Sequence, residues 1–292
     1  MDLKQIVIFA LQVSILCTVF LFGLKATVAD LLYLTHRPRL LARSLLAVFV
    51  LMPLVVVLLD LLFDFRPPVM IVLAALAISP LPPLLPRKES GAGGNASYGL
   101  GLMAVLAIAS IVAVPLSLEI LESVFHRELA MSALTIAGLV IKTTLAPLVA
   151  GVAVRRLMPS VAARIEEPLV RISSVLLTAA VLVLVAGSLS AIWEAVGDGT
   201  VLAMAIVTVA GLAIGHLLGR PNPDHSVVLA LATCCRHPAI ALTIAATNYP
   251  EQRFGGIILL YLVVNALVAL PYLRWQRRPS AAGVATAAPP TR

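Results

Sequence analysis

The sequence contains little charge, few aromatic side chains and few cysteines. Of its 292 residues only 12% are charged and 5% are aromatic, while 61% are hydrophobic. A soluble domain has about 25% charged residues, so this chain has too little polar surface to coat a water-soluble globule of its size. Lipid must therefore be its outer solvent, and apolar helices that cross the membrane must build its fold.

The three cysteines match neither a metal-ligand spacing nor an extracellular disulfide framework. Cys17 stands alone, and Cys234 and Cys235 are adjacent inside an apolar run. We therefore expect no disulfide and no metal site. The net charge of +7 does not indicate a nucleic-acid partner either, because the basic residues lie between apolar runs and do not gather on one soluble face.

Nine apolar segments, each near the length of about 20 residues that spans a bilayer, follow one another along the chain. We expect spans at residues 5–24, 44–63, 69–87, 98–118, 130–154, 170–192, 201–218, 227–248 and 255–273. They predict an all-α polytopic membrane protein with a single transmembrane domain over residues 1–279. The Ala-, Pro- and Thr-rich tail at 280–292 is expected to be disordered.

The lysines and arginines divide unevenly between the two sides that nine spans define. Fifteen of the 21 fall on one side and four on the other, while Lys142 and Arg236 lie inside spans. Because short cytoplasmic loops are enriched in lysine and arginine, this asymmetry predicts a cytoplasmic C-terminus and an N-terminus outside. We expect the protein in the plasma (inner) membrane.

Two of the nine segments are interrupted by proline. The run A-I-S-P-L-P-P-L-L-P-R-K-E at 77–89 has four prolines, among them Pro80 and Pro83, and no continuous α-helix can pass through it. In L-A-T-C-C-R-H-P-A-I-A-L at 231–242, Pro238 breaks the helix. A lone proline in a membrane helix is usually a kink, which is the alternative here. Paired breaks are instead typical of a transport site.

The two breaks occupy matching places when the chain is compared with itself. After a shift of 155 positions, A-L-A at 75–77 falls on A-L-A at 230–232, and Pro83 falls on Pro238. The third and eighth spans cross the membrane in opposite directions, so the match predicts an inverted repeat. The two repeats are expected at about 5–121 and 130–274.

Polar residues beside the breaks and inside the spans are the candidate site. A cation at mid-membrane costs at least about 2.5–3.5 kcal/mol, so Arg236 and Lys142 need partners, and few carboxylates lie at that depth. Two such cations favour an anionic cargo. For Arg236 the alternative is a structural lock with Glu89 or with carbonyl groups, and for His237 it is packing in place of proton transfer. The candidate substrate-binding residues are Arg236, His237, Lys142, Ser79, Pro80, Pro83, Pro238, Asn265 and Thr143.

At these residues the chain resembles the bile acid:sodium symporter family. The likeness runs from F-L-F-G-L-K-A-T at 20–27 through A-V-F-V-L-M-P at 47–53 to Y-L-V-V-N-A at 261–266. The resemblance implies a core domain with two crossed, broken helices and a panel domain, with substrate bound between them. It implies transport of organic anions, usually with sodium, and a nine-span form that lacks the family's first helix.

The two breaks depart from the family pattern. Where the family has the motif Pro-Gly-Gly-x-x-Ser-Asn, Leu85 and Pro86 stand at the Ser and Asn positions of the sodium ligands. Where it has Glu-Val-Gly-Met-Gln-Asn, Ala232 stands at Glu, Arg236 at Gln and His237 at Asn. The family resemblance implies sodium as a coupling ion, but the residues at these positions do not supply its oxygen ligands. One interpretation is that the Arg236 cation occupies the sodium space.

The leading hypothesis is a secondary transporter that moves a small organic anion across the bilayer by alternating access. We do not expect an enzyme. One alternative is nevertheless an integral-membrane enzyme that would use Cys234, Cys235 and His237, the only dense group of reactive side chains. A second alternative is a metalloid efflux permease that uses the two cysteines.

Overall fold

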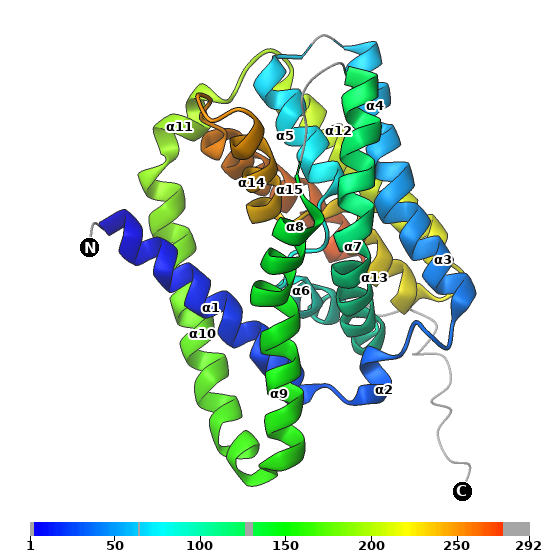
Figure 1. Ribbon diagram of the computed structural model, residues 1–292, viewed down its shortest axis with the longest axis vertical. Coiled ribbons are helices and arrows are strands. Elements are labelled where there is room, and N and C mark those ends of the chain that lie inside the picture. The colour runs from blue at the N-terminus through cyan, green and yellow to red at the C-terminus, as the bar shows by residue number, and fades with distance from the viewer. Residues whose placement is uncertain (1–2, 64, 126–130, 277–292) are drawn as a thin grey trace, which may run out of the picture.

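The computed structural model describes residues 3–63, 65–125 and 131–276, and within these ranges it contains helices and no strand (Figure 1). Eight of its helices are long and apolar enough to cross a membrane. They are α1 (Leu3–Lys25), α3–η1–α4 (Pro38–Leu46, Ala47–Leu51, Met52–Leu62), α7 (Ala96–Phe125), α8–η2–α9 (Ala133–Val140, Ile141–Leu145, Ala146–Leu157), α10 (Pro159–Gly187), α12 (Thr200–Gly219), α13–α14 (Pro223–Cys234, Pro238–Asn248) and α15 (Gly255–Gln276).

These helices confirm an all-α polytopic membrane protein. The third expected span appears as two short helices, α5 (Pro67–Ile78) and α6 (Leu85–Gly91), and α2 (Val28–Leu31) and α11 (Leu189–Glu194) are connecting turns. The count of nine spans and the inverted repeat stay predictions. The tail predicted to be disordered lies outside the described residues.

Helix ends differ most from expectation at α10, which begins at Pro159 and not near residue 170. Its first three turns contain charged residues such as Arg164 and Glu167. Hydropathy marks the thickness of the bilayer, whereas the helix itself continues into the polar layer beyond it.

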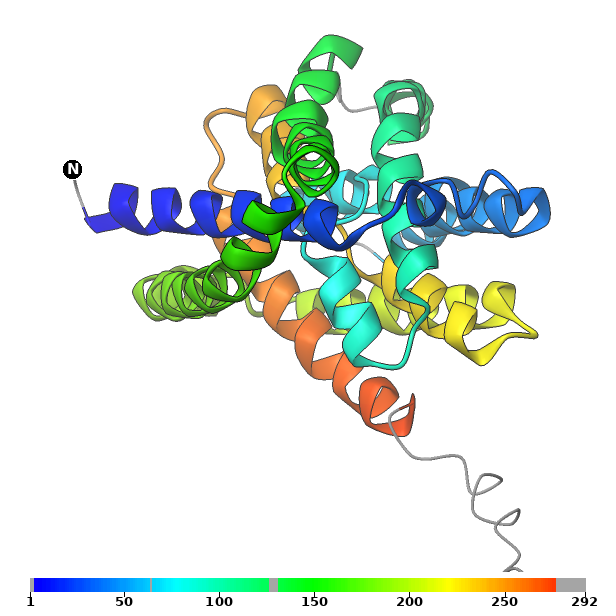
Figure 2. The same cartoon turned by 90° about the horizontal axis from the view of Figure 1, so that it is seen from below.

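Three helices form a group beside the rest of the molecule. We call α1, α8–η2–α9 and α10 the panel, and α3–η1–α4, α5–α7 and α12–α15 the core. Seen from below, α1 and α10 lie on the opposite side of the molecule from α3 and α13 (Figure 2). Within the panel, α1 packs on both α9 and α10, and the buried Ser14 Oγ donates a hydrogen bond of 2.7 Å to the Ser173 carbonyl.

Glycines on α12 bring it into backbone contact with α13. Gly211, Gly215 and Gly219 recur every four residues, so they lie on one face of the helix. A Cβ on Gly215 would overlap the Leu229 carbonyl oxygen and lie 2.5 Å from Ala230 Cα. Such small-residue faces are how membrane helices approach closely. The contact buries α13 and so fixes the helix that carries the second break.

Gly215→Ala should therefore destabilise the protein, because the added methyl group has no room between the two backbones. We expect a loss of about 1–3 kcal/mol, typical of overpacking, seen as a lower melting temperature of the purified protein in detergent. Gly138→Ala is the matched control, since no heavy atom lies within 4 Å of its added Cβ. Equal melting temperatures for the two variants would contradict this account of the α12–α13 contact.

Candidate functional site

The first break separates α5 from α6. Helix α5 ends at Ile78, and the chain is not helical from Ser79 to Leu84. The prolines in this stretch lack the N–H that a continuing helix would need. Ser79 adopts an extended conformation, and its Oγ donates to the Leu76 carbonyl at 2.9 Å. The side chain thus satisfies one carbonyl group that the helix end leaves free.

The second break lies between α13 and α14. Helix α13 ends at Cys234, and α14 begins at Pro238, whose fixed backbone angle suits the first helical position. His237 caps α14, because its Nδ1 accepts a hydrogen bond of 3.4 Å from the Ile240 N–H. The break itself is therefore only three residues long, 235–237.

Hydrogen bonds join the two breaks directly. The His237 N–H donates to the Pro80 carbonyl at 3.0 Å and to Ser79 Oγ at 3.2 Å. Arg236 Nη1 donates to the Ser79 carbonyl, also at 3.2 Å. The structure thus brings Ser79, Pro80, Arg236 and His237 together, with Pro238 adjoining them in the chain. The two breaks therefore meet at one crossing, as the family resemblance implied.

Arg236 is one of the most deeply buried side chains, with 2% of its surface exposed. Besides Ser79, it contacts the core through Nη2, which donates to the Val48 carbonyl at 2.9 Å. Val48 lies in η1, a π-helical turn inside the α3–η1–α4 helix. Both hydrogen bonds of the Arg236 guanidinium go to carbonyl oxygens, and Arg236 forms no ion pair with Glu89 in the part of the chain that the structure describes. This geometry matches the carbonyl form of the structural lock.

Helix α15 holds the freed end of α13. The Cys234 carbonyl accepts hydrogen bonds from Tyr261 Oη at 2.7 Å and from Asn265 Nδ2 at 2.8 Å. Asn265 Oδ1 in turn accepts from Cys235 Sγ at 3.4 Å. Asn265 was a sequence candidate, whereas Tyr261 was not. Their spacing of four residues on one helix face was the available signal.

Two charged residues directly after the first break also belong to this region. Lys88 is half-buried, and its Nζ lies 3.6 Å from Cys235 Sγ in the second break. Glu89 is 1% exposed and lies against Gly99 in the first turn of α7. Neither carboxyl oxygen of Glu89 has a hydrogen-bond partner within the described ranges. The sequence reasoning treated Glu89 only as a partner for Arg236 and did not single out Lys88.

The remaining candidates are not joined to the crossing. Lys142 lies in η2 of the panel with an exposed side chain, and η2 packs against α1 and α7. Thr143 Oγ1 donates to the Leu139 carbonyl of its own helix at 2.8 Å. Pro83 is buried in the first break, but no hydrogen bond among the described residues links it to the second break. Lys142 and Thr143 are therefore panel residues, and any contact that they make with a solute at the crossing would come from the panel side.

The family's sodium sites do not fit this crossing. Leu85, Pro86 and Ala232 are buried and offer no side-chain oxygen. The Ser79 and Val48 carbonyl oxygens, which are hard ligands of the kind that sodium prefers, already accept hydrogen bonds from Arg236. The described residues also contain no group of three or more His, Cys, Asp or Glu placed to hold a metal ion.

The model of the Sodium Bile acid symporter family matches residues 12–195, which is more than half of the chain. The chain belongs to this family. No curated protein sequence matches it. The matched region runs from α1 through α11, so it contains the first break but not the second. Together with eight apolar helices, membership makes the chain an integral membrane protein of a family of secondary transporters for organic anions and related small solutes.

The two donors to the Cys234 carbonyl allow a test of how this symporter-family crossing is held together. Tyr261→Phe or Asn265→Leu alone leaves the carbonyl one partner, and each should lower stability by about 1 kcal/mol. The double variant leaves a buried carbonyl unpaired, so it should lose clearly more than the sum of the two single losses. Thermal melting of all four proteins measures this, and strictly additive losses would contradict the shared capping role.

Proposed function

We propose that the protein is a secondary transporter that carries a small organic anion by alternating access between panel and core. The observation that carries the proposal is a set of buried polar atoms at the crossing that have no hydrogen-bond partner among the described residues: His237 Nε2, Arg236 Nε and both carboxyl oxygens of Glu89. Buried polar atoms are almost always hydrogen-bonded. A transported solute, a coupling ion or water would supply the missing partners.

Charge near the crossing favours an anionic solute. Arg236 and Lys88 lie at the breaks, Lys142 lies in η2 of the panel, which packs against α7 of the core, and the acid Glu89 follows Lys88 in the chain. The α14 N-terminus adds the positive end of a helix dipole, because it begins directly after the break. Intramembrane cations of this kind commonly mark a solute pathway.

The position of the Arg236 guanidinium bears on which ion is coupled to transport. A guanidinium that bonds to both the Ser79 and Val48 carbonyls supplies a fixed positive charge where the family uses sodium. We therefore propose that transport is independent of sodium. Glu89, a buried carboxyl group with no hydrogen-bond partner among the described residues, is the group we propose as the proton carrier.

We also propose the plasma (inner) membrane as the location, with the N-terminus outside and the C-terminus cytoplasmic. The support is the uneven division of lysine and arginine between the two sides. In this orientation α6, with Arg87 and Lys88, lies toward the cytoplasm. Arg87 Nη1 donates to Ser174 Oγ of α10 at 3.0 Å, so core and panel touch there.

Uptake by purified protein in liposomes tests the anion pathway. We expect Lys142→Gln to reduce uptake of a transported organic anion at least about tenfold without a change in melting temperature, because the exposed Lys142 side chain makes no hydrogen bond or ion pair within the described residues. Lys25→Gln is the matched control, since Lys25 is an exposed panel lysine whose ion pair with Glu166 is solvent-facing. Equal uptake by all three proteins would contradict the role of Lys142.

The coupling proposal predicts a separate result. Glu89→Gln keeps the shape of the side chain but cannot exchange a proton, so uptake should lose its dependence on an imposed pH gradient. Glu122→Gln, at an exposed position on α7, is the control that should behave as wild type. Replacing sodium by choline in the buffer should leave the uptake rate of both variants unchanged. Uptake that follows the sodium gradient, in either protein, would overturn this assignment.

The cysteine-based alternative keeps one supporting observation. Cys234 Sγ and Cys235 Sγ lie 3.7 Å apart, both buried at the second break, and Lys88 contacts Cys235. Cells that express the Cys234→Ser/Cys235→Ser variant should show unchanged arsenite tolerance if the organic-anion function is right. Loss of tolerance would favour the metalloid permease.

A further inference from the structure

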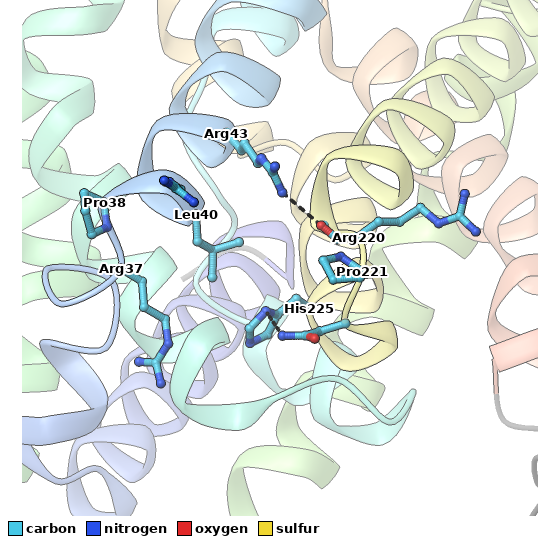
Figure 3. Close-up of a pocket in the computed structure, with 10 residues that line it drawn as sticks. Arg37, Pro38, Leu40, Arg43, Arg220, Pro221 and His225 are labelled. Atoms are coloured by element: carbon cyan, nitrogen blue, oxygen red, sulfur yellow. Dashed lines mark hydrogen bonds between the residues drawn. The ribbon is translucent and has the colours of Figure 1, made fainter.

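A cavity of about 520 Å³ lies between the N-terminal end of α3 and the link from α12 to α13. Four arginines line it: Arg37, Arg39, Arg43 and Arg220 (Figure 3). His225 is also in the wall, and no Asp or Glu is among the lining residues. The proposed function uses none of these residues, although such a concentration of like charge is unfavourable without an anion.

Most of the guanidinium donors in this cavity are available. Arg43 Nη1 reaches across to the Arg220 carbonyl at 2.9 Å, and Arg37 Nη1 donates to the Tyr33 carbonyl at 3.2 Å. In Figure 3 the Arg37 side chain extends to the lower left and the Arg220 side chain to the right of this contact, so their guanidinium groups point away from one another. None of the four arginines forms an ion pair within the described ranges. Each guanidinium has five N–H donors, so a bound anion finds many partners.

The neighbouring acid and the helix end add to this character. Asp224 adjoins His225, but its carboxylate already accepts from Asn95 Nδ2 and from the His225 N–H. Helix α3 begins at Pro38, its N-cap Arg37 makes no side-chain capping bond, and Leu41 supplies the first N–H that bonds back to Arg37. The N–H groups of the first turn therefore have no acceptor within the helix.

An exposed apolar stripe leads away from two of these arginines. Arg39 and Arg43 continue along one face of α3–η1–α4 at steps of three or four residues, which is the spacing of a single helix face. The exposed residues of this stripe are Leu46, Val50, Leu54, Leu58 and Leu61. On α12 the exposed residues Val209, Ala213 and Leu217 lead in the same way to Arg220.

We propose that this cavity, which we call the arginine pocket, binds the phosphate headgroup of an anionic phospholipid whose acyl chains lie along the apolar stripe. Arginine forks match phosphate oxygens in geometry as well as charge. A free phosphate would use the same donors, but it has no use for an apolar stripe that begins at the headgroup site. The pocket lies on the side predicted to be cytoplasmic, where anionic lipids attract basic segments.

The experiment compares lipids and variants on the purified full chain in detergent. Native mass spectrometry would measure the apparent dissociation constants of phosphatidylglycerol and phosphatidylcholine with the same acyl chains, with inorganic phosphate as a competitor. The variant is Arg39→Gln/Arg220→Gln, because these two side chains make no hydrogen bond within the described residues. The control is Arg155→Gln/Arg156→Gln, which removes the same charge from the panel's α9–α10 end.

We expect wild type and control to prefer phosphatidylglycerol over phosphatidylcholine. The pocket variant should bind phosphatidylglycerol at least about tenfold more weakly than wild type does. Millimolar inorganic phosphate should not displace the lipid. A melting temperature near that of wild type in lipid-free detergent would show that the variant is folded; if it is not, the single Arg39→Gln variant takes its place. Equal weakening in both double variants, no preference between lipids, or displacement by inorganic phosphate would overturn the proposal.

Discussion

The contact between the two helix breaks is the constraint on which the rest of the core depends. An unpaired backbone group in a membrane interior costs several kcal/mol, and the prolines at both breaks remove helical partners. The breaks satisfy each other through the His237 N–H and the Ser79 and Pro80 oxygens. Helix α15 satisfies the Cys234 carbonyl. The glycine face of α12 then has to hold α13 in this position.

Arg236 makes that arrangement permanent. An ion bound at carbonyl oxygens leaves and returns, whereas a guanidinium tethered to the chain remains. In a family named for sodium symport, a bound ion could both neutralise the crossed helix ends and supply a driving force. In the function that we propose, Arg236 takes the first role through the Ser79 and Val48 carbonyls. The second role then needs another group, and Glu89 is a buried carboxyl without a hydrogen-bond partner among the described residues.

The sequence predicted the breaks because proline acts locally and leaves few outcomes, whereas the meeting of the two breaks came from the family resemblance. It did not predict the Val48 carbonyl as the acceptor for Arg236, because that contact requires a π-helical turn 188 residues away along the chain. Nor did it identify Tyr261, because its hydroxyl has a partner only where the second break leaves the Cys234 carbonyl without a helical N–H. For Lys142, the position within an apolar segment predicts its depth in the membrane. The direction of its side chain instead depends on how the panel helices pack, which the sequence does not give.

The helix α3–η1–α4 belongs to both basic sites of the molecule. Val48, which accepts from Arg236, lies five residues after Arg43 of the arginine pocket, or about 7.5 Å along a helix. Proximity alone does not establish energetic coupling. However, the Val48 carbonyl reaches Arg236 only while this helix keeps its position along its own axis. A phospholipid bound at the N-terminal end would oppose such sliding, so its effect on transport would reach the crossing through the position of one carbonyl group.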